Sequence, residues 1–348
     1  MIDISQAKLE YLCIHRVGNK NNGDDLILSQ SPIAISDEKL SKALHKYFIQ
    51  HFSVHELYSF TFSNEDYTLN PIFNYTLGVF SMPNTILKNS VDIAKHLYES
   101  STHPQIKKGD LFVAYFTNIR VGEKTTEALG IFKAENKAPF MKVEHERELF
   151  QVYYDKGIHL NKLDKGCFVI NSDRENGFQV CIVDNPTKTT ETQYWRNTFL
   201  NIKAKSDEFH KTSAILQLTK SFITNDLTEE MFEDRTEQID LLNRSVDYFK
   251  NNENFDKDDF MQNVFEEEKL IDAFKGFDKV YSQDNEITIN DNFNISAQAV
   301  KKYSNVFKSV LKLDKNFHIY IHGDKDLIER GVDEDGRKFY KIYFEEES

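Results

Sequence analysis

The sequence is poor in cysteine, proline and uninterrupted hydrophobic runs. Its three cysteines, Cys13, Cys167 and Cys181, form no Cys-x-x-Cys pair, and this odd, scattered set suits a reducing compartment. No run approaches the ~20 apolar residues that a membrane-spanning helix needs. The N-terminus carries an acidic Asp3 and lacks the pattern of a secretory signal. We therefore expect a soluble, cytoplasmic protein that makes no membrane contact.

Recognisable catalytic motifs are absent as well. The chain has no GxxxxGK[ST] phosphate loop, no Rossmann glycine pattern and no GxSxG nucleophile elbow. His51 and His55 have the spacing of a helical metal pair, with Glu56 beside them, but Phe52 stands where an HExxH motif has glutamate. We interpret these residues as polar groups at a helix end, and we predict no metal and no cofactor.

A metal-dependent nuclease is the enzyme class that a few charged residues of the sequence suggest. Asp110, Glu127 and Lys133 lie around two expected strands and superficially suggest acids gathered at a scissile phosphate. Glu127 and Lys133 lack the tight acid-x-Lys spacing of the common nuclease core. Charges at strand ends explain them more simply, so we predict no catalytic residues and keep a nuclease as the least favoured alternative.

Aromatic side chains and acidic charge are what the chain has in abundance. It holds 28 Phe and 16 Tyr in 348 residues, and 40% of the residues are hydrophobic, which is typical of a globular protein with room for two domains. The formal net charge is -13, and residues 228–268 contain 14 Asp or Glu against four Lys or Arg. This segment carries most of the surplus, so the overall acidity does not decide the charge of the rest of the surface.

Residues 1–203 predict an α+β domain with an antiparallel sheet. Helical and period-two patterns occur in small groups rather than in strict alternation, which argues against a parallel sheet. The expected strands are residues 7–17, 26–35, 57–62, 75–80, 111–119, 126–134, 166–171 and 179–184. The expected helices are residues 36–48, which Ser36 can cap, and 83–99. Cys167 and Cys181 should lie on adjacent strands as small buried residues.

Residues 204–348 predict a helical segment followed by a small unit of one helix and strands. Helical periodicity begins at Asp207, continues in an acidic helix that Thr228 can cap, and resumes near residues 258–265 and 267–277. From Ser296, apolar residues recur at three-and-four spacing as far as Leu311, which predicts one continuous helix. Aromatic-rich strands are then expected at residues 317–321 and 338–344.

Lysines on this last helix are the main binding candidates. Three of them fall on a narrow arc opposite the apolar stripe, two more extend the row, and residues 295–344 hold ten Lys or Arg against seven Asp or Glu. Ammonium groups attract phosphates, and two strand tyrosines could pack on a sugar or an unstacked base. An ordinary solvated helix face is the alternative interpretation. The candidates are Lys301, Lys302, Lys308, Lys312, Lys315, Tyr320 and Tyr343.

The same region carries a resemblance to a known family. The run KLDKNFHIYIHG is followed by LIERG, DEDG and KFYKIYF, and GDLFVAY, LGIFK and LNKLDKGCFVIN occur upstream. Together these motifs resemble the NdpA-like nucleoid-associated proteins, bacterial proteins recovered with the compacted chromosome. The resemblance implies association with the nucleoid and assigns no contact residue. None of the motifs is a catalytic signature.

These observations predict a non-catalytic, nucleoid-associated protein that binds DNA with weak sequence preference. Lys and Arg side chains would neutralise phosphates, so binding would depend on salt, and RNA stays open as a ligand. A homodimer would double a modest basic patch. The rival from another class is an adaptor that binds DNA-processing enzymes through the acidic helices.

Overall fold

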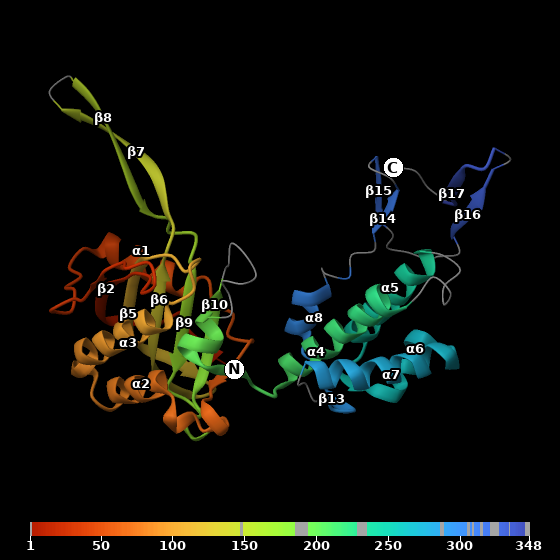
Figure 1. Cartoon of the computed structure of the whole chain (residues 1–348), viewed down its shortest axis with the longest axis horizontal. Helices are drawn as coiled ribbons and strands as arrows, with labels where there is room; N and C mark the ends of the chain where they lie inside the picture. The colour runs from red at the N-terminus through yellow and green to blue at the C-terminus, as the bar shows by residue number, and fades with distance from the viewer. Residues whose placement is uncertain are drawn as a thin grey trace. The chain divides into compact units, whose positions relative to one another are not determined.

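The computed structural model describes residues 2–146, 149–184, 194–227, 235–285, 289–304, 307, 310–313, 316–320, 327–333 and 335–344. The chain divides into an N-terminal unit, Met1–Lys205, and a C-terminal unit, Ser206–Ser348. The helices and strands of both units are drawn in Figure 1. Each unit encloses hydrophobic clusters of its own.

A nine-stranded antiparallel sheet forms the centre of the N-terminal unit. Its order is β11-β4-β10-β9-β6-β5-β2-β3, with β1 paired to β5. The strands are β1 (Ile2–Asp3), β2 (Lys8–Val17), β3 (Leu26–Ile27), β4 (Tyr58–Phe60), β5 (Gly109–Val121), β6 (Lys124–Ala134), β9 (Lys165–Ile170), β10 (Gln179–Asp184) and β11 (Ile202–Ala204). A large antiparallel sheet with separate helices confirms the predicted α+β class.

Helices cover both faces of this sheet. They are α1 (Glu38–Ile49), α2 (Pro71–Ser81) and α3 (Ile86–Ser100). Successive residues of a strand point to opposite faces. Val113 of β5 accordingly belongs to the cluster that contains Ile93 of α3, whereas its neighbour Phe112 packs against Phe48 of α1. Apolar residues therefore follow one another along β5 without polar alternation.

Two sequence predictions for this unit are wrong. Residues 75–80 were expected as a strand but lie in α2, where Asn70 caps the helix and Pro71 occupies its first turn. The expected strand at residues 26–35 is reduced to the two residues of β3. The helix expected at residues 36–48 is confirmed as α1, although Asp37 rather than Ser36 caps it.

A long hairpin was not predicted at all. Its strands are β7 (Lys137–Glu146) and β8 (Leu149–Ile158), which form a two-stranded sheet of their own. Figure 1 shows the pair extending away from the nine-stranded sheet. This structure is called the ribbon below.

In the described part of the C-terminal unit, five α-helices pack around a core rich in phenylalanine. These are α4 (Glu208–Ser221), α5 (Arg235–Asn251), α6 (Lys257–Phe265), α7 (Glu268–Asp284) and α8 (Ala297–Ser304). Its described strands are β12 (Asn254–Asp256), β13 (Asn292–Asn294), β14 (Val310–Leu313), β15 (Phe317–Tyr320), β16 (Ile328–Val332) and β17 (Lys338–Ile342), paired in sequential twos. The helices expected near residues 258–265 and 267–277 are confirmed, while Thr228 lies outside the described residues.

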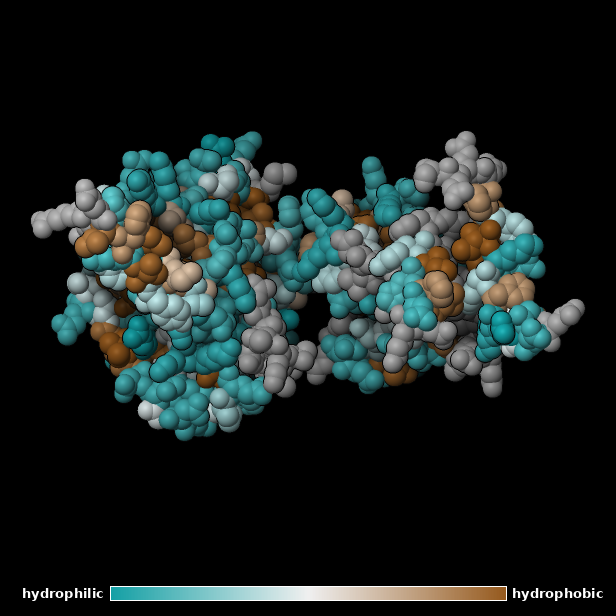
Figure 2. Space-filling model, turned by 90° about the horizontal axis from the view of Figure 1, so that it is seen from above, coloured by the Kyte–Doolittle hydropathy of each residue, from teal (hydrophilic) through white to brown (hydrophobic). Residues whose placement is uncertain are grey.

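On the face seen in Figure 2, hydrophilic residues predominate among the coloured ones, and hydrophobic groups show in patches. Across the described residues, no helix combines the length and apolarity needed to cross a membrane.

His15 is a buried histidine held in its neutral form. Its Nδ1 accepts a hydrogen bond from the Ser29 backbone N–H at 3.0 Å, and its Nε2 lies 3.0 Å from Ser90 Oγ. Because the Ser90 hydroxyl donates to the Leu87 carbonyl, it accepts from Nε2–H. Burial lowers the pKa of His15 from 6.5 to about 4. A proton on Nδ1 would also face the Ser29 donor.

Acid is therefore expected to destabilise the N-terminal unit between pH 6.5 and 4. Between these pH values His15 is protonated in the unfolded chain but neutral in the folded one. The free energy of unfolding is therefore fully retained above pH 6.5 and falls by about 3 kcal/mol as the pH drops to 4. Urea unfolding followed by Trp195 fluorescence at several pH values measures this. A His15→Gln variant should show a flatter profile, and an unchanged slope would contradict the assignment. Burial also lowers the pKa of His96, which leaves a residual slope.

Candidate nucleic-acid interface

Helix α8 presents two of the candidate lysines to solvent. Its first turn is fixed by Ser296, whose Oγ lies 3.4 Å from the Ala299 N–H and whose own N–H donates to Thr212 Oγ1 of α4 at 3.0 Å. Ala299 and Val300 are buried. Lys301 and Lys302 follow on the exposed side, since burial of one helix face leaves the other in water.

The prediction of one continuous helix that carries the lysine row is wrong. Helix α8 ends at Ser304, and Val310–Leu313 form strand β14 instead of further helical turns. Lys312 thus lies on a strand, in register with His318 of β15. The run Val-Leu-Lys-Leu fits the two-residue period of a strand as well as the helical period. Residues 310–313 pair with β15 and do not extend α8. Lys308 and Lys315 lie outside the described residues.

The structure places another cation near Lys301. A pocket of about 510 Å³ lies between the end of α5 and α8, and its lining includes Lys250, Glu253 and Lys301. Lys250 Nζ is 3.5 Å from Asp247 Oδ1, an exposed contact that contributes little. Among the described residues, no carboxylate lies within ion-pair distance of Lys301. Sequence reasoning missed Lys250 because 51 positions separate it from Lys301.

Lys302 sits against aromatic rings. Its Nζ lies 5.7 Å from the ring centre of Phe209 and 5.3 Å from that of Tyr303. Such cation–π contacts restrain the lysine while its ammonium keeps its charge. Lys301 therefore has the greater freedom to meet a ligand.

The two candidate tyrosines lie on different hairpins that share one small cluster. Ile239 of α5 is packed by residues from β14–β15 and from β16–β17, namely Leu313, Ile319, Ile328 and Tyr340. Tyr320 is 59% exposed on β15, so its ring can accept a stacking partner. Tyr343 already donates from its hydroxyl to Glu329 Oε2 at 2.6 Å, and Lys341 Nζ lies 4.6 Å from its ring centre. Tyr320 is the better placed of the two.

Further cations lie on the β16–β17 hairpin. Arg330, Arg337, Lys338 and Lys341 are all exposed there. Lys341 Nζ is 3.7 Å from Glu329 Oε2, which offsets part of the charge. The alternation of basic and aromatic residues in KFYKIYF is the signal that could have identified this hairpin as a contact surface.

Several carboxylates of the acidic segment have structural partners. Asp256 caps α6 by accepting the Asp259 N–H at 2.9 Å. Arg244 reaches Asp240 at 3.1 Å and Glu266 at 2.7 Å. Side chains engaged in caps and ion pairs are less available to a basic partner protein.

The residues considered for catalysis lie in ordinary structural contacts. Asp110 pairs with Arg16 at 2.9 Å and with Lys137 at 2.8 Å, while Glu127 accepts the Asn171 side-chain amide at 2.7 Å. Lys133 is fully buried, so it is a core residue rather than the strand-end charge expected from sequence. Within the described part of the chain, no cluster of three or more His, Cys, Asp or Glu could hold a metal.

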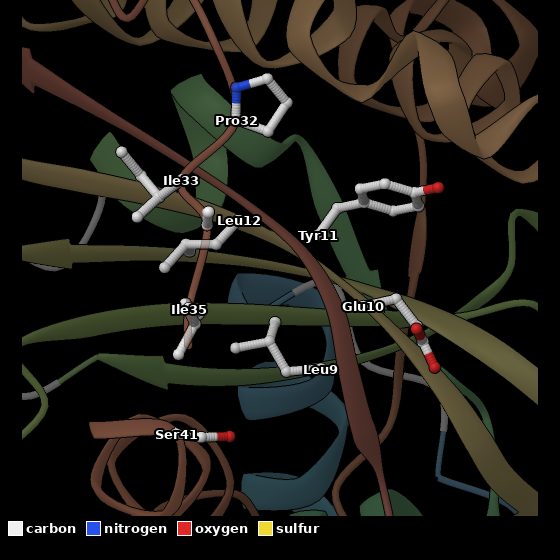
Figure 3. Close-up of a pocket in the computed structure, with 9 residues that line it drawn as sticks. Leu9, Glu10, Tyr11, Leu12, Pro32, Ile33, Ile35 and Ser41 are labelled. Carbon is white, nitrogen blue, oxygen red and sulfur yellow. The ribbon is translucent and has the colours of Figure 1, made fainter. Parts of the chain in front are cut away.

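A second pocket, of about 320 Å³, lies in the N-terminal unit between β2 and residues 32–35 (Figure 3). Glu10 is the charged side chain in its lining, and Lys8 Nζ lies 2.9 Å from that carboxylate. A lining that offers a carboxylate and no cation disfavours a phosphate-bearing ligand.

These features define a two-unit α+β protein with exposed cations on its C-terminal unit. A model of the family described as nucleoid-associated protein YejK matches residues 13–340. No curated protein matches the chain. Because the match extends from β2 to β17, the chain belongs to the nucleoid-associated protein YejK family and has a nucleoid-associated role. The predicted family is confirmed.

Proposed function

We propose that the protein binds DNA in the nucleoid without catalysis and with weak sequence preference, through the surface formed by α8, the end of α5 and the two C-terminal hairpins. The observation that carries the proposal is the exposed Lys301, which lies beside Lys250 on one pocket and has no acidic partner among the described residues. The ammonium groups of Lys301 and of Lys250, whose exposed contact with Asp247 is weak, attract neighbouring phosphates at any sequence.

Exposed aromatic side chains lie on the two hairpins, which pack on Ile239 near the start of α5, the helix whose end carries Lys250. Tyr320 offers a ring that can contact a sugar or an unstacked base, and the cations of β16–β17 extend the positive charge. The chain's surplus of acid weakens such binding at long range, so affinity should be modest for one copy. A homodimer would present two surfaces and gain affinity through avidity.

Replacing Lys250 and Lys301 together with Ala is expected to weaken duplex DNA binding on the order of tenfold. Each phosphate contact contributes ~0.9 to the slope of log K against log salt, so the slope should fall by about 2. Fluorescence anisotropy with unrelated duplexes, measured across a salt series, gives both quantities. An RNA duplex of equal length, used as competitor, tests the choice of nucleic acid.

The matched control is Lys275→Ala with Lys279→Ala, which removes the same charge from exposed positions of α7. If both double variants weaken binding equally, only net charge matters and the surface is wrongly placed. Wild-type binding that ignores salt would favour the adaptor role. Cleavage of the DNA on addition of Mg²⁺ or Mn²⁺ would overturn the non-catalytic assignment.

A further inference from the structure

The ribbon has one strongly apolar face that water surrounds. In an antiparallel hairpin, residues paired across the strands share a face. Three consecutive same-face pairs are Met141–Tyr154, Val143–Val152 and His145–Phe150. Met141 is 76% exposed and Phe150 74% exposed, and the other four side chains are exposed too. These six residues are called the apolar stripe below.

The opposite face of the ribbon is mixed: Phe140 (48% exposed) and Leu149 (68% exposed) lie there beside polar side chains that pair with one another. Lys142 forms an ion pair with Glu144, and the Tyr153 hydroxyl donates to Gln151 Oε1. The apolar stripe is the face on which exposed apolar pairs follow one another without an intervening charged residue, and such an exposed patch marks an interaction surface. A two-stranded ribbon with an uncovered apolar face is marginally stable by itself.

The base of the ribbon is held firmly on the sheet. Asp164 Oδ2 accepts the backbone N–H groups of Glu135 and Asn136 at 2.8 and 2.9 Å, and its Oδ1 accepts the Asn136 side-chain amide at 2.8 Å. Lys137 Nζ reaches Asp110 Oδ2 at 2.8 Å. These contacts fix the bend between β6 and β7, where the ribbon leaves the nine-stranded sheet (Figure 1).

We propose that the ribbon is a homodimer interface in which the apolar stripes of two copies pack face to face. The stripe is self-complementary, with a small Val143–Val152 pair between two larger pairs. A twofold axis through the valines sets Met141 and Tyr154 of one copy against His145 and Phe150 of the other. Sulfur–aromatic and aromatic contacts then form twice.

The area of the apolar stripe and the charge of the ribbon both favour a second copy of the chain as the partner that covers the stripe. Six side chains of this size offer ~600 Å² per copy, most of the ~800 Å² per partner that a stable interface buries. The sequences of β7 and β8 together contain three Lys against three Asp or Glu, so two ribbons meet without net repulsion. The same neutrality gives duplex DNA no attraction to the ribbon.

Analytical ultracentrifugation of the full chain at graded micromolar concentrations tests the proposal. The wild type should sediment as a concentration-dependent dimer. Val152→Lys places a charge from each copy at the axis and should raise the dimer Kd at least about a hundredfold. Gln151→Lys adds the same charge one residue away on the opposite face, outside the proposed interface, and should leave the Kd unchanged. Trp195 fluorescence checks that both variants fold.

Oxidative cross-linking locates the contact independently. The native cysteines are buried. Val152→Cys should therefore form an intermolecular disulfide across the axis, whereas Gln151→Cys should not. A wild type that stays monomeric, a Val152→Lys variant that dimerises as well as wild type, or equal cross-linking of the two cysteine variants would each overturn the proposal.

Discussion

Replacing Lys133 with Met is expected to lower the free energy of unfolding of the N-terminal unit by about 3–5 kcal/mol. Lys133 is fully buried on β6, and its Nζ lies 2.9 Å from Glu135 Oε1 and 2.7 Å from the Lys107 carbonyl oxygen. The Glu135 side chain is 7% exposed. Removing the ammonium leaves that carboxylate without its cation in a region that water barely reaches.

Neighbouring buried groups depend on the same arrangement. Lys165 pairs with Asp184 at 2.7 Å, and Tyr194 donates to Glu135 at 3.2 Å while its ring centre lies 5.8 and 5.2 Å from the two lysine Nζ atoms. Burial lowers the pKa of Lys133, and Glu135 opposes that effect. In such a network the loss of one member weakens the remaining hydrogen bonds.

Urea unfolding followed by fluorescence measures the effect in this unit alone. Trp195, the single tryptophan of the chain, is buried beside Tyr194, and its Nε1 donates to the Gly166 carbonyl at 3.3 Å. Adding Glu135→Gln to Lys133→Met removes the stranded charge and should restore much of the stability. Lys124→Met, at the exposed start of the same strand, is the control and should change little. Equal stability of all three variants would refute the pairing.

Local patterns predicted most elements of the N-terminal unit. Residues 111–119 and 126–134 are rich in apolar side chains and emerge as β5 and β6. The ribbon was missed although Met-Lys-Val-Glu-His, residues 141–145, alternates with period two, because alternation normally indicates a buried face and this face is exposed. Burial of Lys133 could not be predicted, since a lysine in a strand carries no sign of what will cover it.

The candidate interface was predictable only in part. Lys301 and Lys302 follow from the helical stripe that begins at Ser296, because that stripe fixes which side meets water. The approach of Lys250 depends on the packing of α5 against α8, which no local pattern specifies. Lys312 was misplaced because four residues that fit both periods paired with β15.

Replacing Phe260 with Ala is expected to destabilise the C-terminal unit by about 3–5 kcal/mol. Phe260, in α6, is fully buried, and five aromatic rings surround it with centroids 5.1 to 6.1 Å away. These are Tyr248, Phe249, Phe255, Phe265 and Phe274. Val300 of α8 belongs to the same cluster, so loss of this core also removes the support of Lys301.

Near-ultraviolet circular dichroism during urea unfolding should show the loss in the Phe260→Ala variant, because the C-terminal unit contains tyrosine and phenylalanine but no tryptophan. The Trp195 transition should stay in place, since Trp195 belongs to the other unit. Phe317→Ala is the matched control: that ring is 62% exposed and its removal should cost less than about 0.5 kcal/mol. If DNA binding disappears in Phe260→Ala while the Trp195 transition is unchanged, the binding surface depends on the C-terminal unit. Full binding by a variant whose C-terminal unit has unfolded would instead assign DNA to the N-terminal sheet.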